Sequence, residues 1–132
     1  MTLLLKTIDQ IPGRGTFDGP SLNLDLGQVT ARAIIRARVI EEVERYNRDG
    51  AIPGHAGLIT PAPQEEVLNR PRHQRRQLLD PERQVDVALA AVRAGRVIIL
   101  FNGEQVSDLD APLPVTPVSE ARFLRLLPLA GG

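Results

Sequence analysis

The stretch "SLNLDLGQVTARAIIRARVIEEVERYN" (residues 21–47) decides the fold class, because two periodicities follow one another within it. Strict alternation of leucine with polar residues predicts a half-buried strand over residues 21–27. Residues 28–47 contain neither glycine nor proline, and their apolar residues recur at helical spacing, so we expect a long helix there. Its apolar row is Ala33, Ala37, Ile40 and Val43, widened by Ile35, Val39 and Tyr46; Arg32, Arg36, Glu41, Glu42 and Arg45 lie mostly on the other side.

The N-terminal stretch "TLLLKTID" (residues 2–9) predicts a second strand, the natural partner of the strand at residues 21–27. Between them, "QIPGRGTFDGP" (residues 10–20) holds three glycines and two prolines, which is typical of a turn-rich connection. Two strands followed by a helix form a compact half-domain, so we expect an α+β fold.

The second half of the chain predicts another helix and three further extended segments. Asp80 is a good N-cap, Pro81 suits the first helical position, and Gly95 stops the helix, which we place at residues 81–94. Its buried stripe would be Val85, Ala88, Leu89 and Val92. Next, "RVIILFNGEQV" (residues 96–106) carries an Asn-Gly pair between apolar runs, a strong hairpin signal. A last strand then begins at "ARFLRLL" and leads into a flexible tail at residues 128–132.

The segment between the two helices, about residues 49–79, reads as an insertion into a single domain that spans residues 1–132. It is rich in glycine and proline, and a loop of this length is usually functional or mobile. Four arginines gather near its end, and either a solvated loop or a basic partner-binding patch accounts for them. They are Arg70, Arg72, Arg75 and Arg76.

Composition excludes several classes of function. There is no cysteine, and the two histidines, His55 and His73, are too few and too far apart for a metal site. Sixteen basic and sixteen acidic residues cancel, which argues against nucleic-acid binding. No apolar run is long enough for a membrane span or a signal peptide, so we expect a cytoplasmic protein. Asp108 and Asp110 are expected to be local hydrogen-bond acceptors rather than catalytic acids, and we expect no enzyme.

The printed sequence ends in "FLRLLPLAGG" (residues 123–132), an apolar stretch followed by two glycines. Glycine makes up about 7% of average composition, so a Gly-Gly end arises by chance in roughly half a percent of proteins. The pair therefore has functional meaning only together with the residues that precede it.

Three stretches resemble ubiquitin-like proteins. "LLLKT" (residues 3–7) looks like ubiquitin's opening strand, and "LFNGEQV" (residues 100–106) is similar to the strand, glycine turn and short return in its middle. "FLRLLPLAGG" is similar to its final strand and diglycine tail. The resemblance covers about residues 1–47 and 96–132. It implies a ubiquitin-like β-grasp fold: a mixed four- to five-stranded sheet, a long helix packed on it, and here an inserted loop and a second helix.

In this family an activating enzyme uses ATP to adenylate the terminal glycine carboxylate, which passes to a nucleophile and then to an amine, or receives sulfur. Glycines at 131 and 132 have no Cβ, so they can thread a narrow channel and leave the carbonyl open to attack. Residues Pro128, Leu129 and Ala130 would occupy that channel. The resemblance thus implies a substrate that binds no cofactor itself, with an activating enzyme, a conjugating enzyme, a deconjugating peptidase and a target protein as partners.

The details favour a bacterial modifier but leave alternatives open. Lys6 is the only lysine among sixteen basic residues, a bias typical of GC-rich bacterial genomes. Ubiquitin has arginines where this tail has Pro128 and Ala130, and "PLAGG" is closer to the sulfur-carrier subunit of molybdopterin synthase. A sulfur carrier that forms a C-terminal thiocarboxylate is therefore the alternative, and a β-grasp interaction module that is never conjugated is the third.

The resemblance also implies a docking patch and a site for chain formation. Leu100 and Leu126 correspond to an exposed apolar surface of the family, while the other interpretation is that either side chain faces the core. Glu104 stands where the family's main chain-building lysine would be. Lys6 is then the candidate side-chain amine for polymeric chains.

Overall fold

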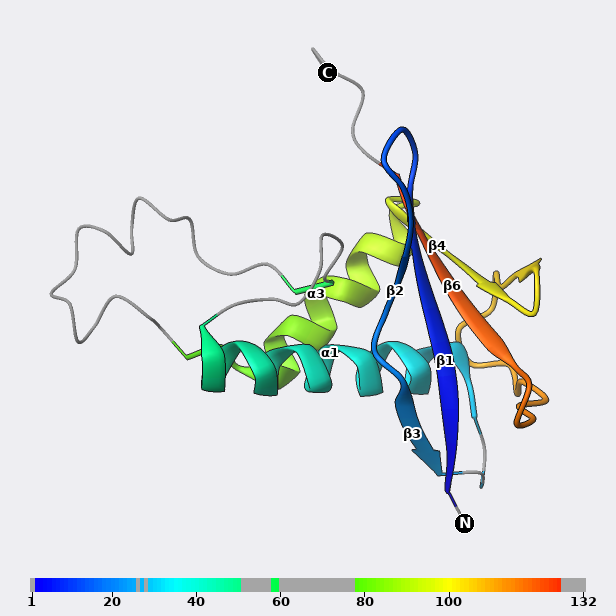
Figure 1. Cartoon of the computed structure of the whole chain (residues 1–132), viewed down its shortest axis with the longest axis horizontal. Helices are drawn as coiled ribbons and strands as arrows, with labels where there is room; N and C mark the ends of the chain where they lie inside the picture. Colours follow the sequence, from blue (N-terminus) through cyan, green and yellow to red (C-terminus); the bar gives the residue numbers. More distant parts are fainter. Residues whose placement is uncertain (1, 26, 28, 51–57, 60–77, 127–132) are drawn as a thin grey trace, which may run out of the picture.

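The computed structural model describes residues 2–25, 27, 29–50, 58–59 and 78–126. These residues form an α+β fold, a mixed six-stranded sheet with two helices on one side (Figure 1). The elements are β1 (Thr2–Ile11), β2 (Gly15–Asp18), β3 (Leu22–Asp25), α1 (Ala31–Asp49), α3 (Pro81–Arg93), β4 (Val97–Phe101), β5 (Glu104–Gln105) and β6 (Glu120–Arg125).

Strand β1 organises the sheet because it pairs on both sides. The strand order is β2-β1-β6-β4-β5, and β3 also pairs with β1. The first half of β1 pairs with β3 and its second half with β2, both antiparallel, so the predicted pairing of the first strand with residues 21–27 is confirmed. On its other side β1 runs parallel to β6, and this is the one parallel pair of the described sheet. The first and last strands therefore form its centre.

The expected count of four to five strands was wrong, because the connection at residues 10–20 contains a strand. β1 continues to Ile11, the chain turns with Arg14 N–H donating to the Ile11 carbonyl at 2.9 Å, and β2 pairs back as far as Asp18. A four-residue edge strand that begins at Gly15 has too few β-branched residues to stand out among its turn-forming neighbours.

Helix α1 begins after Thr30, whose hydroxyl accepts the Ala33 N–H at 3.1 Å, and ends at Gly50 with φ 74°. It is therefore shifted by two to three residues from the expected 28–47. Its buried face is also rotated from the predicted row, since Ala33, Ala37 and Ile40 are only half-buried. The residues that face the core are Ala31, Ile34, Ile35, Arg38, Val39, Glu42, Val43 and Tyr46.

The second half matches the sequence more closely. Asp80 accepts the Glu82 N–H at 3.1 Å and Pro81 begins α3, as predicted. Its residues Val85, Ala88 and Leu89 are buried, while Val92 is half-buried. The predicted hairpin is confirmed: Asn102 and Gly103 both have positive φ, 51° and 88°, which a two-residue turn requires.

The core lies between the helices and one face of the sheet. Leu5 of β1, Ile99 of β4 and Phe123 of β6 meet Ile34 and Val39 of α1 there. Leu58 and Ile59 join this core with 7% and 3% exposure, so part of the segment expected to be an insertion is buried. Neither described helix is apolar over a membrane-spanning length.

Candidate functional site

The predicted conjugation residues, Gly131 and Gly132, lie outside the described residues, and so do Pro128, Leu129 and Ala130. The described chain ends at Leu126, whose N–H donates to the Arg96 carbonyl at 2.8 Å. That bond continues the β4–β6 ladder by one pair beyond Arg125. The predicted tail therefore follows a hydrogen-bonded end of the central strand β6.

Leu100, one of the two predicted docking residues, lies on the sheet face that points away from the helices. Its neighbours in β4, Ile99 and Phe101, face the core, while Leu100 itself is half-buried on the other side. Ile98 and Leu124 share this outer face, directly opposite one another in the β4–β6 register. They extend the predicted patch into a short apolar strip, which the sequence analysis did not include.

Leu126, the second docking residue, is 37% exposed and lies one residue beyond β6. It lines a groove against α3, at the end of the β4–β6 ladder away from Leu100. The predicted amine acceptor, Lys6, is exposed on β1 and lies beside Glu120 in the parallel register. The structure thus gives the two leucines different neighbours and leaves Lys6 accessible.

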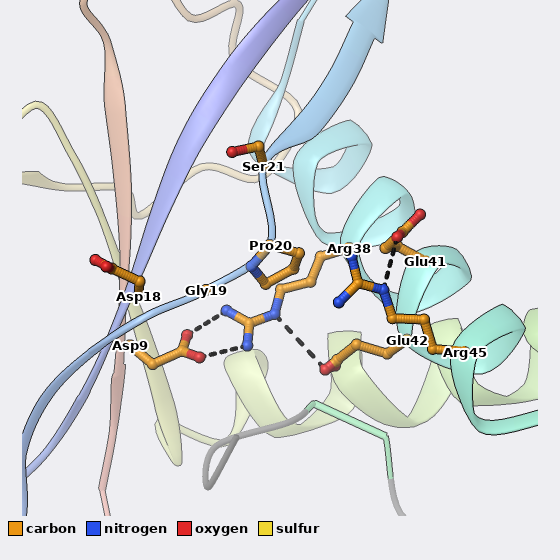
Figure 2. A pocket seen from close by; sticks show the side chains of 9 residues that line it. All are labelled: Asp9, Asp18, Gly19, Pro20, Ser21, Arg38, Glu41, Glu42 and Arg45. Carbon is orange, nitrogen blue, oxygen red and sulfur yellow. Dashed lines mark hydrogen bonds and ion pairs between the residues drawn. The ribbon is translucent and has the colours of Figure 1, made fainter. Parts of the chain in front are cut away.

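A buried charge cluster, which the sequence analysis missed, joins α1 to the sheet (Figure 2). Arg38 is 1% exposed, and its two terminal nitrogens donate to the two carboxylate oxygens of Asp9, the second bond being 2.7 Å. The Arg38 Nε lies 3.7 Å from the Glu42 carboxylate. The guanidinium carbon lies 4.6 Å from the centre of the Phe123 ring, a cation–π distance.

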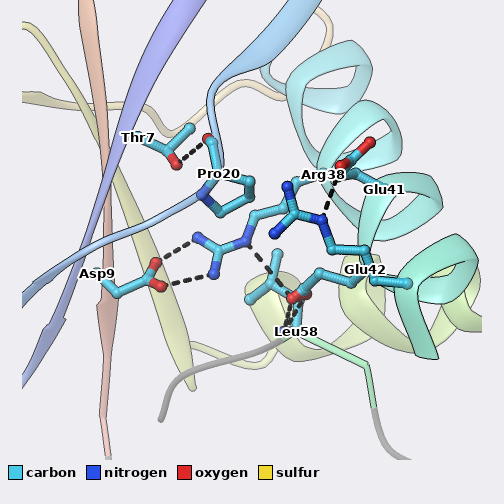
Figure 3. Close-up of polar contacts among 8 residues, drawn as sticks. Thr7, Asp9, Pro20, Arg38, Glu41, Glu42 and Leu58 are labelled. Atoms are coloured by element: carbon cyan, nitrogen blue, oxygen red, sulfur yellow. Dashed lines mark hydrogen bonds and ion pairs between the residues drawn. The ribbon is translucent and has the colours of Figure 1, made fainter. Parts of the chain in front are cut away.

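The cluster occupies the place where β1 changes partners from β3 to β2 (Figure 3). There Gly19 N–H donates to the Thr7 carbonyl at 3.0 Å, and the Thr7 hydroxyl donates to the Pro20 carbonyl at 2.5 Å. A Cβ on Gly19 would collide with the Thr7 hydroxyl. Glycine at this position therefore lets the chain pass close to β1 beside the Arg38 guanidinium.

Glu42 connects the cluster to the segment that follows α1. Both of its carboxylate oxygens accept the Leu58 N–H, at 2.6 and 3.0 Å, as Figure 3 shows. Burial raises the pKa of Glu42 above its ordinary value, although Arg38 and the Leu58 N–H act in the opposite direction. The helical periodicity predicted Glu42 on the polar side of the helix, and this was wrong because a carboxylate can be buried where donors surround it.

The pocket beside this cluster has a volume of about 440 Å³ but offers little chemistry. Most of its charged groups are paired with one another, Asp9 with Arg38 and Glu41 with Arg45, while Asp18 is an exposed carboxylate at its edge. An exposed hydroxyl, Ser21, lines it, yet the described ranges include neither histidine nor cysteine that could activate it. Within the same ranges no three acidic or histidine side chains are grouped to hold a metal ion.

Of the two acidic residues of the turn-rich "SDLDAP", Asp108 is a local hydrogen-bond acceptor, as predicted, whereas the prediction of a local role was wrong for Asp110, which bonds Arg32 78 positions away. Asp108 accepts the Asp110 N–H at 2.9 Å, and Asp110 accepts from the Arg32 Nε at 2.7 Å. The hydrogen bond from Arg32, together with the positive charge of its guanidinium, holds the pKa of Asp110 below its ordinary value. The contact between Asp110 and Arg32 fixes the loop against the start of α1, where the Arg32 N–H also donates to the Leu109 carbonyl.

The chain matches no family model, no curated protein and no solved structure.

Proposed function

We propose that this protein is a bacterial ubiquitin-like modifier with a β-grasp fold, conjugated to targets through Gly132. The observation that carries the proposal is the position of β6. It lies beside β1 in the centre of the sheet, parallel to it, and residues 127–132 follow directly from its end. Helix α1 packs across one face of the same sheet, an arrangement compatible with a β-grasp fold (Figure 1).

Conjugation needs a carboxylate held away from a rigid domain. The six residues after Leu126, "LPLAGG", span at most about 20 Å when extended, enough to enter a partner's active site. A Gly132 carboxylate oxygen would attack the α-phosphorus of ATP, pyrophosphate would leave, and an acyl-adenylate would form on the activating enzyme. A nucleophile of that enzyme would displace AMP, and a target amine would then attack the carbonyl and displace that nucleophile to form the amide. The chain is a substrate in each step.

The strip Ile98, Leu100 and Leu124 suits the docking of those partners. It lies on the sheet face that the helices leave uncovered, with Arg122 beside it. Arg122 donates to Gln10 at 3.0 Å, which holds a polar border next to the apolar side chains. In this proposal Leu100 contributes to recognition, and Lys6 on the same sheet is the side-chain amine for polymeric chains.

The test is to express an N-terminally tagged copy beside its neighbouring genes and to purify it under denaturing conditions. Trypsin cleaves after Arg125, so a modified target lysine keeps the remnant "LLPLAGG". We expect this remnant in mass spectra of the wild type and none when Gly132 is deleted. The matched control is Lys6→Arg, which leaves the tail intact and should lose only branches at Lys6.

The sulfur carrier remains the second candidate because of the tail sequence "PLAGG". It shares the adenylation step, after which a sulfur donor displaces AMP and leaves a thiocarboxylate on Gly132. A free protein in which one terminal oxygen is replaced by sulfur would establish this function. If neither that species nor the remnant forms in the presence of the activating enzyme, the domain is an interaction module that is not conjugated.

A further inference from the structure

A groove of about 510 Å³ lies between α3 and the ends of β4 and β6, separate from the Arg38 cluster. One wall is α3, where small side chains, Ala90 and Ala94 among them, let another chain approach the helix closely. Leu58 contributes from the segment between the helices, and Leu126 forms the opposite side. This volume is within the range of about 300–1,000 Å³ that ligand sites occupy.

The groove is apolar and partly open to solvent. Val87 of α3 and Leu126 are each 37% exposed, and they are two of the five large apolar side chains exposed among the described residues. Ala90 and Ala94 beside them are exposed as well. Scattered exposed apolar side chains are ordinary, but here two of the five line the same groove.

The charged side chains that line the groove, among the described residues, have one sign. Arg96 and Arg125 line it, and its lining within the described chain includes no aspartate or glutamate. Arg125 also interacts electrostatically with Glu42, where it opposes the rise in that carboxyl's pKa that burial causes. Arg96 is exposed, and its carbonyl is held by Leu126 N–H, which fixes its backbone at the rim.

We propose that this groove binds a short segment of a partner protein whose apolar side chains are flanked by aspartate or glutamate. Apolar side chains would cover Val87, Ala90 and Leu126, and the acidic neighbours would face Arg96 and Arg125. Charge complementarity of this kind selects the partner and sets its orientation. The inference goes beyond the proposed conjugation: α3 lies outside the stretches that resemble ubiquitin, and binding here requires no activated tail.

The experiment selects peptides from a random display library against the full immobilised chain and measures the selected peptides by fluorescence anisotropy. We expect enrichment of apolar residues flanked by Asp or Glu. Ala90→Glu, which fills the groove at an exposed helical position, should weaken binding about tenfold or more. Arg96→Glu should do the same and should shift a repeated selection toward basic peptides. The matched control is Val118→Asp, because Val118 is 91% exposed but does not line the groove.

Several results would overturn the proposal. They are a selection that enriches no peptide, peptides without acidic preference, and binding that survives both Ala90→Glu and Arg96→Glu. Loss of binding in Leu100→Asp would place the site on the outer sheet face instead. Thermal unfolding of each variant shows whether it remains folded. Deletion of Gly131 and Gly132 should leave peptide binding unchanged, so failure of the conjugation proposal and failure of this one are distinguishable.

Discussion

Replacing Asp9 by alanine should strongly destabilise the protein, because it removes the main partner of a buried cation. Asp9 supplies both acceptors for the terminal nitrogens of Arg38, which is 1% exposed. After the substitution the Glu42 carboxylate, 3.7 Å away, and the Phe123 ring would still face the guanidinium, but the bidentate acceptor would be lost. Removing one partner of a buried pair costs about 3–5 kcal/mol. The free energy of unfolding of a domain of this size is roughly 5–15 kcal/mol in total.

The assay is equilibrium unfolding in urea with thermal unfolding beside it. A loss of that size corresponds to a fall in Tm of about 10–20 °C. Asp9→Asn should behave similarly, since the amide keeps an acceptor but not the charge. The matched control is Asp18→Ala, an exposed carboxylate that lines the same pocket, which we expect to change stability by less than about 0.5 kcal/mol.

A double-mutant cycle tests the cause rather than the size of the effect. Once Arg38→Met removes the buried charge, Asp9→Ala should cost less than it does in the wild type, with a coupling energy of about 1–3 kcal/mol. Equal losses for Asp9→Ala and Asp18→Ala, or strict additivity with Arg38→Met, would refute the reasoning that the pair is a desolvated ionic contact.

Three further predictions concern other contacts. Burial raises the folded-state pKa of Glu42 above 4.5, so the folded state favours the protonated carboxyl. The stability that this protonation contributes is complete below pH 4.5 and is lost as the pH rises through the folded-state pKa. Urea unfolding at a series of pH values should therefore show the wild type losing stability relative to Glu42→Gln, and a constant difference would contradict this. Gly19→Ala should cost about 1–3 kcal/mol in chemical unfolding, and less in a Thr7→Ala background that lacks the colliding hydroxyl. In Arg36→Ala the pKa of Glu82, which the Arg36 bond lowers, should return toward 4.5 in an NMR titration; an unchanged value would show that the pair does not persist in solution.

Local signals predicted the second half of the chain well. The N-cap at Asp80, Pro81 and the Asn102-Gly103 pair each specify backbone geometry within a few residues, and the structure has the helix and the hairpin where these signals place them. The fold class, α+β, follows from the same kind of pattern. Such signals depend on neighbours in sequence, so distant parts of the fold cannot override them easily.

The features that the sequence did not predict depend on contacts between residues far apart along the chain. Periodicity assigns charged residues to the surface, yet Arg38 and Glu42 are buried because Asp9, 29 positions before Arg38, and the Leu58 N–H satisfy them. Strand β2 was hidden because its pairing with β1, rather than its composition, makes it a strand. The groove beside α3 is likewise lined by Val87 and Leu126, which are 39 positions apart in the sequence, and no local pattern indicates that they share a site.

The parallel pair at the centre of the sheet also determines when the protein can fold. Arg122 bonds Gln10, 112 positions away in the sequence. Contacts between residues so far apart raise the contact order of the fold, so we expect them to form slowly. During synthesis, at about 5–20 residues per second, β1 can pair with β2 and β3 early but must wait for β6 until residues 120–125 have been made. Under the proposed function, the strand that completes the sheet also leads to the reactive carboxylate. A nascent chain released before residue 120 would have neither, so under that function such a truncated chain could not be conjugated.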